Sequence, residues 1–148
     1  ALEHPVAQMI QMTSFVYEGV FDRFPKLRVG FLEAGTGWVP YMIDRLDRFF
    51  DGMNRNGYRE FSSALKTRPS DIFASGRIYF SCEGGEISLK NLVERIGHKG
   101  LIFASDFPHE TNIEHAMHEM EEMLERDDVS DEAKQGIFCD NIETFYGR

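Results

Sequence analysis

Three short apolar segments alternate with helical patterns along the chain, and this alternation restricts the fold more than any other feature of the sequence. The apolar segments are residues 27–32, 77–82 and 101–105. Short apolar runs bounded by glycine, proline or polar residues are typical of strands buried in a parallel sheet. Elsewhere, apolar side chains recur at steps of three and four residues, which predicts helices over residues 5–23, 37–53 and 86–96. The pattern indicates an α/β fold built from βαβ units.

The rest of the chain fits the same plan. After the third predicted strand, apolar spacing predicts three helices over residues 113–124, 133–138 and 142–146. Residues 54–75 are polar and predict a long connection, in which residues 68–71 form either a turn or a helix cap. We therefore expect helices to pack on a three-stranded parallel sheet.

Three strands cannot close a barrel. A complete (β/α)8 barrel needs roughly 250 residues, whereas this chain has 148 and begins with Ala1 rather than methionine. The predicted sheet has two open edges, which partners or a longer protein must cover. We treat residues 1–148 as a single domain that forms part of a barrel and lacks the first strands, and we expect it to form homo-oligomers.

The distribution of charge excludes several classes of partner. Residues 106–148 carry thirteen acidic and three basic side chains, which leaves the first 105 residues close to neutral. Nucleic acid is not an expected partner, because no basic stripe could neutralise phosphates. The sequence contains neither an apolar run of the ~20 residues that cross a membrane nor a signal-peptide pattern. Cys82 and Cys139 lack zinc-site spacing, so we expect reduced thiols in a cytoplasmic protein.

A carboxylate directly follows each predicted strand. These residues are Glu33, Glu83 and Asp106. The carboxyl ends of parallel strands meet at one edge of a sheet, so the three side chains are predicted to converge there. They could bind a metal ion or act as acid and base. Each could instead cap a helix or bond within a loop, and this structural alternative is strongest for Glu83.

One loop combines two metal-competent groups. Asp106 and His109 lie in the segment 105–109, which Pro108 makes rigid. The other histidines are predicted to lie in loops or on helix surfaces; they are His4, His98, His115 and His118. The segment Gly35-Thr36-Gly37 lacks the full spacing of a phosphate loop, and a backbone turn is the simpler interpretation.

Four segments together resemble the amidohydrolase-related family, in the branch that contains aminocarboxymuconate-semialdehyde decarboxylase and the resorcylate decarboxylases. They are residues 19–29 (GVFDRFPKLRV), 32–41 (LEAGTGWVPY), 104–109 (ASDFPH) and 141–147 (NIETFYG). The resemblance covers nearly the whole chain but only the carboxyl-terminal portion of the family's barrel.

The resemblance implies a distorted (β/α)8 barrel that holds one divalent metal, most often zinc. In the family the ligands are a His-x-His pair on strand one, a histidine on strand five and an aspartate on strand eight. Asp106 matches the aspartate, whereas the His-x-His pair is absent and only His4 lies near the strand-five position. Decarboxylases of this branch commonly carry histidine where this chain has Glu33. His109 matches a position beside the substrate or the metal ligands.

The resemblance favours a metal-dependent hydrolase that acts on a small organic acid, lactone or cyclic amide. Asp106 would serve as both metal ligand and catalytic base, and Glu33, Glu83 and His109 would line the substrate pocket. Two alternatives remain: a non-oxidative decarboxylase of the same family, and an inactive half-barrel that associates with itself. The incomplete ligand set is what keeps the second alternative open.

Overall fold

The three strands form one parallel sheet in the computed structural model, as the sequence predicts. The structure describes residues 2–56, 64–109 and 111–148. The strands are β1 (Val29–Phe31), β2 (Ile78–Cys82) and β3 (Leu101–Phe103). They lie in the order β1-β2-β3, with Phe31 opposite Phe80 and Cys82 opposite Phe103. The edge strands β1 and β3 are shorter than predicted, because each is hydrogen-bonded only where it faces β2.

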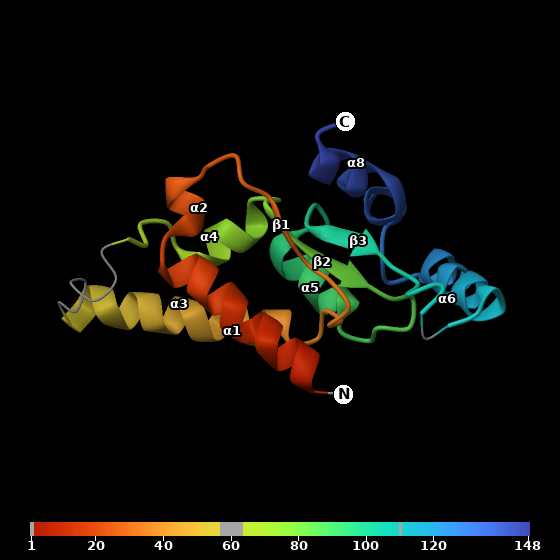
Figure 1. Ribbon diagram of the computed structural model, residues 1–148, viewed down its shortest axis with the longest axis horizontal. Helices are drawn as coiled ribbons and strands as arrows, with labels where there is room; N and C mark the ends of the chain where they lie inside the picture. The colour runs from red at the N-terminus through yellow and green to blue at the C-terminus, as the bar shows by residue number, and fades with distance from the viewer. Residues whose placement is uncertain (1, 57–63, 110) are drawn as a thin grey trace.

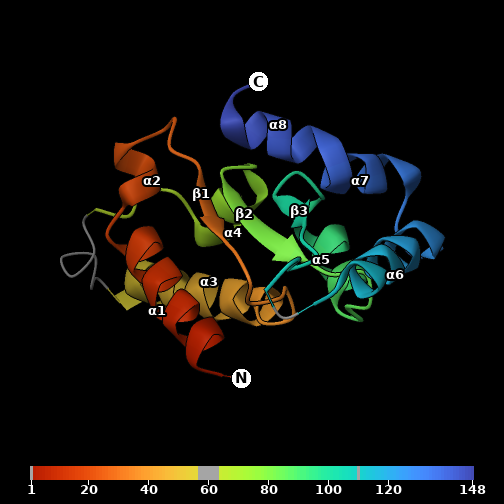
Figure 2. The same ribbon diagram turned by 45° about the vertical axis from the view of Figure 1, so that its right-hand side comes forward.

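Helices connect the strands and cover the sheet (Figures 1 and 2). They are α1 (Glu3–Tyr17), α2 (Val20–Arg23), α3 (Val39–Asn56), α4 (Pro69–Ala74), α5 (Leu89–Ile96), α6 (Ile113–Glu125), α7 (Asp131–Gln135), the π-helix Gly136–Asp140 and α8 (Asn141–Tyr146). Helices α3, α4 and α5 contact one another, whereas the π-helix and α8 contact β3. This arrangement confirms the predicted α/β class.

Both faces of the central strand β2 are buried. On one face, the Phe80 ring stacks on Phe73 of α4 with centroids 6.1 Å apart and meets the edge of Trp38 at 5.6 Å. On the other face, Tyr79 contacts Phe145 of α8 at 5.0 Å. The largely apolar sequence of this strand follows from its position, because a strand covered by helices on both faces buries the side chains of both faces.

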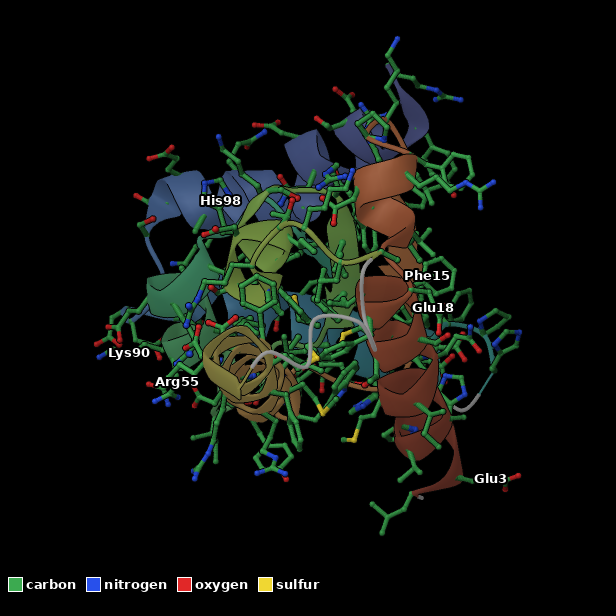
Figure 3. All side chains as sticks on the ribbon, turned by 90° about the vertical axis from the view of Figure 1, so that its left-hand side faces the viewer. Glu3, Phe15, Glu18, Arg55, Lys90 and His98 are labelled. Carbon is green, nitrogen blue, oxygen red and sulfur yellow. The ribbon has the colours of Figure 1, made fainter. Side chains whose placement is uncertain are left out.

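The helix predicted over residues 5–23 is two helices, so that prediction was wrong. Helix α1 begins at Glu3, runs along one flank of the molecule and stops just before Glu18 (Figure 3). Gly19 has a φ of +65°, and a Cβ atom there would lie 2.2 Å from the carbonyl oxygen of Ala64. Only glycine fits this close approach in a left-handed conformation, so the chain turns at Gly19 before α2.

The structure also differs from the prediction in the connection 54–75 and at the break between the last two helices. Within the predicted connection 54–75, α3 continues to Asn56 and α4 begins at Pro69, which favours the helix-cap interpretation of residues 68–71; residues 57–63 lie outside the described part of the chain. The break predicted between the last two helices is replaced by the π-helix. Asn141 donates to the carbonyls of His98 and Leu101, both at 2.7 Å, and these bonds keep the chain against β3.

Asp22 ties α2 to the segment before α4. Its carboxylate accepts hydrogen bonds from the N–H groups of Lys66 (2.8 Å) and Thr67 (3.2 Å) and from the Thr67 hydroxyl. Although burial alone would raise the pKa of this carboxyl, the three hydrogen bonds hold the pKa of Asp22 below its ordinary value. A depressed pKa contributes stability above the unfolded-state pKa, and this contribution is lost as the pH falls through the folded-state pKa.

We therefore expect Asp22→Asn to lower the free energy of unfolding at pH 7 by about 1 kcal/mol, since it weakens charge-assisted hydrogen bonds. The difference from the parent should shrink toward pH 3, where the Asp22 carboxyl of the parent also becomes protonated. Urea unfolding at both pH values measures this effect. Asp127→Asn, at an exposed carboxylate, is the control and should show no such dependence.

The open edges lead to a second prediction. Strands β1 and β3 each have one strand neighbour among the described residues, and exposed apolar side chains follow one face of α6 at Ile113, Met117 and Leu124. Unpaired edges and apolar patches favour association. We expect sedimentation at micromolar concentration to give a mass above that of the monomer; a sharp monomer with cooperative unfolding would contradict this.

Candidate active site

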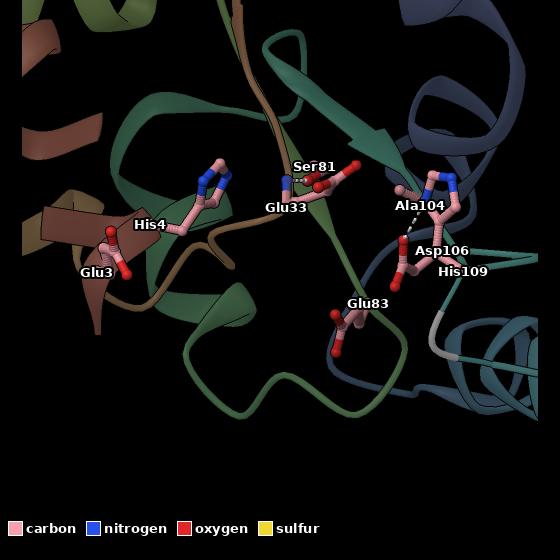
Figure 4. A pocket seen from close by; sticks show the side chains of 8 residues that line it. All are labelled: Glu3, His4, Glu33, Ser81, Glu83, Ala104, Asp106 and His109. Atoms are coloured by element: carbon pink, nitrogen blue, oxygen red, sulfur yellow. Dashed lines mark hydrogen bonds and ion pairs between the residues drawn. The ribbon is translucent and has the colours of Figure 1, made fainter. Parts of the chain in front are cut away.

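A cavity of about 600 Å³ lies where the three strands end, and all three predicted carboxylates line it (Figure 4). Its lining residues are Glu3, His4, Glu33, Ser81, Glu83, Ala104, Asp106 and His109. Glu33 and Asp106 follow β1 and β3, and Glu83 follows β2 directly. The geometry of a parallel sheet therefore brings together residues that are up to 73 positions apart in the sequence.

Glu33 and Asp106 share an unusual backbone conformation. Their φ angles are +62° and +56°, and they are the only described residues other than glycine with positive φ. This region costs a residue with a Cβ atom about 1 kcal/mol or more. Residues held in such conformations concentrate at functional sites, where the surrounding structure enforces them.

Ser81 fixes the end of β1 to the central strand. The N–H of Glu33 donates to the Ser81 hydroxyl at 2.7 Å, and Ser81 itself is buried in β2 (Figure 4). This hydrogen bond holds the backbone of Glu33 at the point where the chain turns away from the sheet.

Asp106, His109 and Glu33 form a group with the chemistry of a metal site. The Nδ1 atom of His109 lies 3.4 Å from Oδ1 of Asp106. One ligand atom from each of the three side chains lies within 4.8 Å of the others. Ligands of a single divalent ion at 2.0–2.2 Å are at most about 4.4 Å apart, so a small movement would allow all three to reach one ion. Two carboxylates and an imidazole suit Mn²⁺ or Zn²⁺.

The carboxyl group of Glu83 has a pKa above its ordinary value. Burial raises its pKa, the charges of Glu119, Glu86 and Asp106 raise it further, and His115 opposes the shift. Within the described part of the chain, its carboxylate accepts no hydrogen bond, and Ser88 rather than Glu83 is the N-cap of α5. The helix-cap alternative for Glu83 was therefore wrong.

A smaller cavity of about 210 Å³ adjoins the first. Its lining residues are Glu83, Ser105, Asp106, Thr111, His115 and Glu119. Glu83 and Asp106 line both cavities, so these two carboxylates separate a space under α6 from the main pocket.

One histidine lies in a different element from the one that the sequence predicts. His4 is exposed, as predicted, but it lies in the first turn of α1 rather than before the helix, and it lines the main cavity with Nε2 2.9 Å from the carbonyl oxygen of Leu32. No local pattern indicates this, because the contact depends on how α1 packs beside β1. His115 and His118 lie on the exposed surface of α6, as predicted.

Sequence reasoning also missed Glu86. Its carboxylate accepts hydrogen bonds from the N–H of Thr36 at 2.7 Å, from the Thr36 hydroxyl and from the N–H of Glu83 at 3.0 Å. These bonds join the loops that follow β1 and β2. The segment 35–37 is therefore a backbone turn, as predicted, and its donors are directed at this carboxylate.

The two thiols are free, in agreement with the sequence prediction. Cys82 is buried in β2, where burial raises the pKa of its thiol, and Cys139 is exposed. Among the described helices, none combines the length and apolar character that a membrane crossing requires.

Comparison with known proteins agrees with this architecture. The family model described as amidohydrolase matches residues 3–148. An amidohydrolase from Mycobacterium avium subsp. paratuberculosis K-10 is 23% identical and superposes with a TM-score of 0.79 over 99% of this chain, which corresponds to 35% of that protein.

Two decarboxylase structures are also similar. One is 5-carboxyvanillate decarboxylase from Novosphingobium aromaticivorans DSM 12444, with bound manganese; it is 20% identical, with a TM-score of 0.78 over 97% of this chain and 40% of that protein. The other is dihydroxybenzoic acid decarboxylase from Polaromonas sp. JS666, with manganese and 2-nitroresorcinol; it is 22% identical, with a TM-score of 0.68 over 93% of this chain and 39% of that protein. The chain spans about two fifths of the length of these structures.

The positive φ angles at the pocket lead to a stability prediction. Glu33→Gly should leave the free energy of unfolding unchanged or raise it, because glycine adopts this conformation without strain. Compared with Glu83→Gln, which removes the same charge, Glu83→Gly should lower the free energy of unfolding by about 0.5–1 kcal/mol, since Glu83 has no positive φ to relieve; Glu33→Gly is compared with Glu33→Gln in the same way. Thermal and urea unfolding of the two variants measure this contrast. Equal losses in both would show that Glu33 is not strained.

Proposed function

Because the chain belongs to the amidohydrolase family, we propose that it forms the carboxyl-terminal part of a metal-dependent hydrolase barrel. The proposed substrate is a small organic acid, lactone or cyclic amide. The single observation that carries the proposal is the convergence of Glu33, Asp106 and His109 at the carboxyl edge of the sheet. That edge is where barrel enzymes hold their catalytic groups.

Asp106 is the proposed metal ligand and catalytic residue. Its carboxylate lies 3.4 Å from the imidazole of His109, and one ligand atom of Glu33 lies within 4.8 Å of both, so these three side chains would hold a divalent ion together. When bound, the ion would polarise the carbonyl group of the substrate and make a water molecule more acidic. Manganese in the two decarboxylase structures supports a divalent ion without favouring zinc.

Glu83 is the proposed proton donor to the leaving group. Hydrolysis of a lactone or cyclic amide requires a proton on the departing oxygen or nitrogen. The raised pKa of Glu83 keeps a larger share of this carboxyl protonated near neutral pH than an ordinary glutamate would. Asp106 accepts a proton during attack, and Glu83 supplies one during departure, so the two carboxylates have different roles.

The charge of the pocket favours an uncharged substrate. Four carboxylates and two imidazoles line the cavity, and the described lining includes no lysine or arginine. Even with a divalent ion held by Glu33 and Asp106, the carboxylates of Glu3 and Glu83 would remain to repel a substrate carboxylate. This favours lactones and cyclic amides among the proposed substrates.

Decarboxylation is the alternative function. Similarity in fold to two decarboxylases supports it, whereas the acidic lining and the glutamate at position 33 favour hydrolysis. An inactive half-barrel is the third candidate, since the His-x-His pair of the family is absent from this sequence.

The test is turnover of lactones, cyclic amides and hydroxybenzoates by protein loaded with Mn²⁺ or Zn²⁺ and containing the complete barrel. We expect hydrolysis, and Asp106→Asn should lower turnover by about a hundred- to ten-thousand-fold because it removes a proton-transfer group. His109→Ala should cost roughly ten- to a hundred-fold in metal affinity or activity.

Release of carbon dioxide from a hydroxybenzoate, without hydrolysis of the other substrates, would favour the decarboxylase. If Asp106→Asn kept its metal and stayed within a factor of a few of the parent, the role of Asp106 would be rejected. Asp127→Asn, at an exposed carboxylate outside the pocket, is the matched control.

A further inference from the structure

The Glu83 side chain depends on its backbone for its position. Glu83 is the first residue after β2, and its carboxylate lines both cavities. Since this carboxylate accepts no hydrogen bond from the described residues, whatever fixes the loop of residues 83–86 also fixes the carboxylate.

Two glutamates hold the N–H groups of this loop. The N–H of Glu83 donates to Glu86 at 3.0 Å, and the N–H of Gly84 donates to Glu119 of α6 at 2.9 Å. The loop also lies directly against α6, because a Cβ atom at Gly84 would lie 2.2 Å from the carbonyl oxygen of Glu119. These contacts place α6 immediately beside the loop that carries Glu83.

One arginine holds the carbonyl groups of the same loop. Arg126 follows the last residue of α6, and its Nη1 donates to the carbonyls of Gly84 at 3.0 Å and Glu86 at 2.7 Å. Its Nε and Nη2 donate to the two carboxylate oxygens of Asp128, both at 2.8 Å. Only 12% of the Arg126 side chain is exposed. A guanidinium can make all these bonds in one plane, whereas an ammonium cannot.

We propose that Arg126 is a positioning residue of the active site, which fixes the loop of residues 83–86 and thereby keeps the Glu83 carboxylate in the pocket. Asp128 orients the guanidinium, and the guanidinium orients the loop. The inference deepens the proposed function, because it concerns the group proposed there as proton donor.

The direction in which the pKa of Glu83 changes when Arg126 is removed distinguishes a positioning role of Arg126 from a simple charge effect. Burial and the carboxylates of Glu119, Glu86 and Asp106 raise the pKa of Glu83, against the opposing effect of His115. If Arg126 acted only as a nearby cation, removing it would raise the pKa of Glu83 further. If Arg126 positions the loop, removing it lets the carboxylate move into water and the pKa falls.

The experiment is a carboxyl-carbon NMR titration of the labelled 148-residue chain, together with amide exchange at Gly84. In Arg126→Ala we expect the Glu83 midpoint to move to lower pH and the Gly84 amide to exchange about tenfold faster or more. Added guanidinium, well below denaturing concentrations, should reverse both changes. Arg126→Lys is the milder variant for use if the alanine variant does not fold, and it should shift the midpoint in the same direction by less.

Arg68→Ala is the matched control. Arg68 also makes a bidentate pair with a carboxylate, that of Asp51, and the side-chain hydrogen bonds that it makes to described residues all go to α3. It should lower the melting temperature without moving the Glu83 midpoint. An unchanged or raised midpoint in the folded Arg126 variants, or an equal shift in Arg68→Ala, would overturn the proposal. Neither substrate nor metal is needed, so this result is independent of whether the chain belongs to a hydrolase.

Discussion

The pairing of β2 with a strand on each side is the constraint on which the rest of the structure depends. Because β1 and β3 both run parallel to β2, all three strands end at the same edge. Helices cover both faces of β2 through Phe80 and Tyr79, so the strand has little freedom to slide. A shift of one residue would turn Ser81 away from Glu33 and separate the carboxylates that this edge brings together.

The same edge concentrates negative charge. Burial raises the pKa of Glu83, and repulsion from the carboxylates of Glu119, Glu86 and Asp106 raises it further. This clustering is electrostatically unfavourable. Glu33 and Asp106 add backbone strain, because their left-handed conformations are unfavourable for residues with side chains. Neither feature adds to stability, so a requirement for carboxylates at these positions explains both.

Features encoded by neighbouring residues could be predicted from the sequence. The strands, and the carboxylates that follow them, depend on short apolar runs and on the direction of parallel strands. The turn at Gly19 could not be predicted, because it results from an approach by Ala64, 45 positions away. Glu86 and Arg126 were missed for the same reason, since both act on the pocket through contacts between distant segments, and the contact of His4 with the end of β1 could not be predicted either. Asp106 and His109 were found because they share one loop.

Arg126 is one of the few basic residues in the acidic part of the chain that begins at Asp106. Only three basic side chains occur among residues 106–148, against thirteen acidic ones. One of them, Lys134, contacts the end of α6 and Asp131. Arg126 is the one whose hydrogen bonds reach the pocket loop. Its Nη1 donates to carbonyl oxygens of that loop, and its Nε and Nη2 donate to Asp128. Its charge is thus matched by Asp128 and does not neutralise the carboxylates that line the pocket. The pocket remains acidic, which suits a site that gains its positive charge from a metal ion.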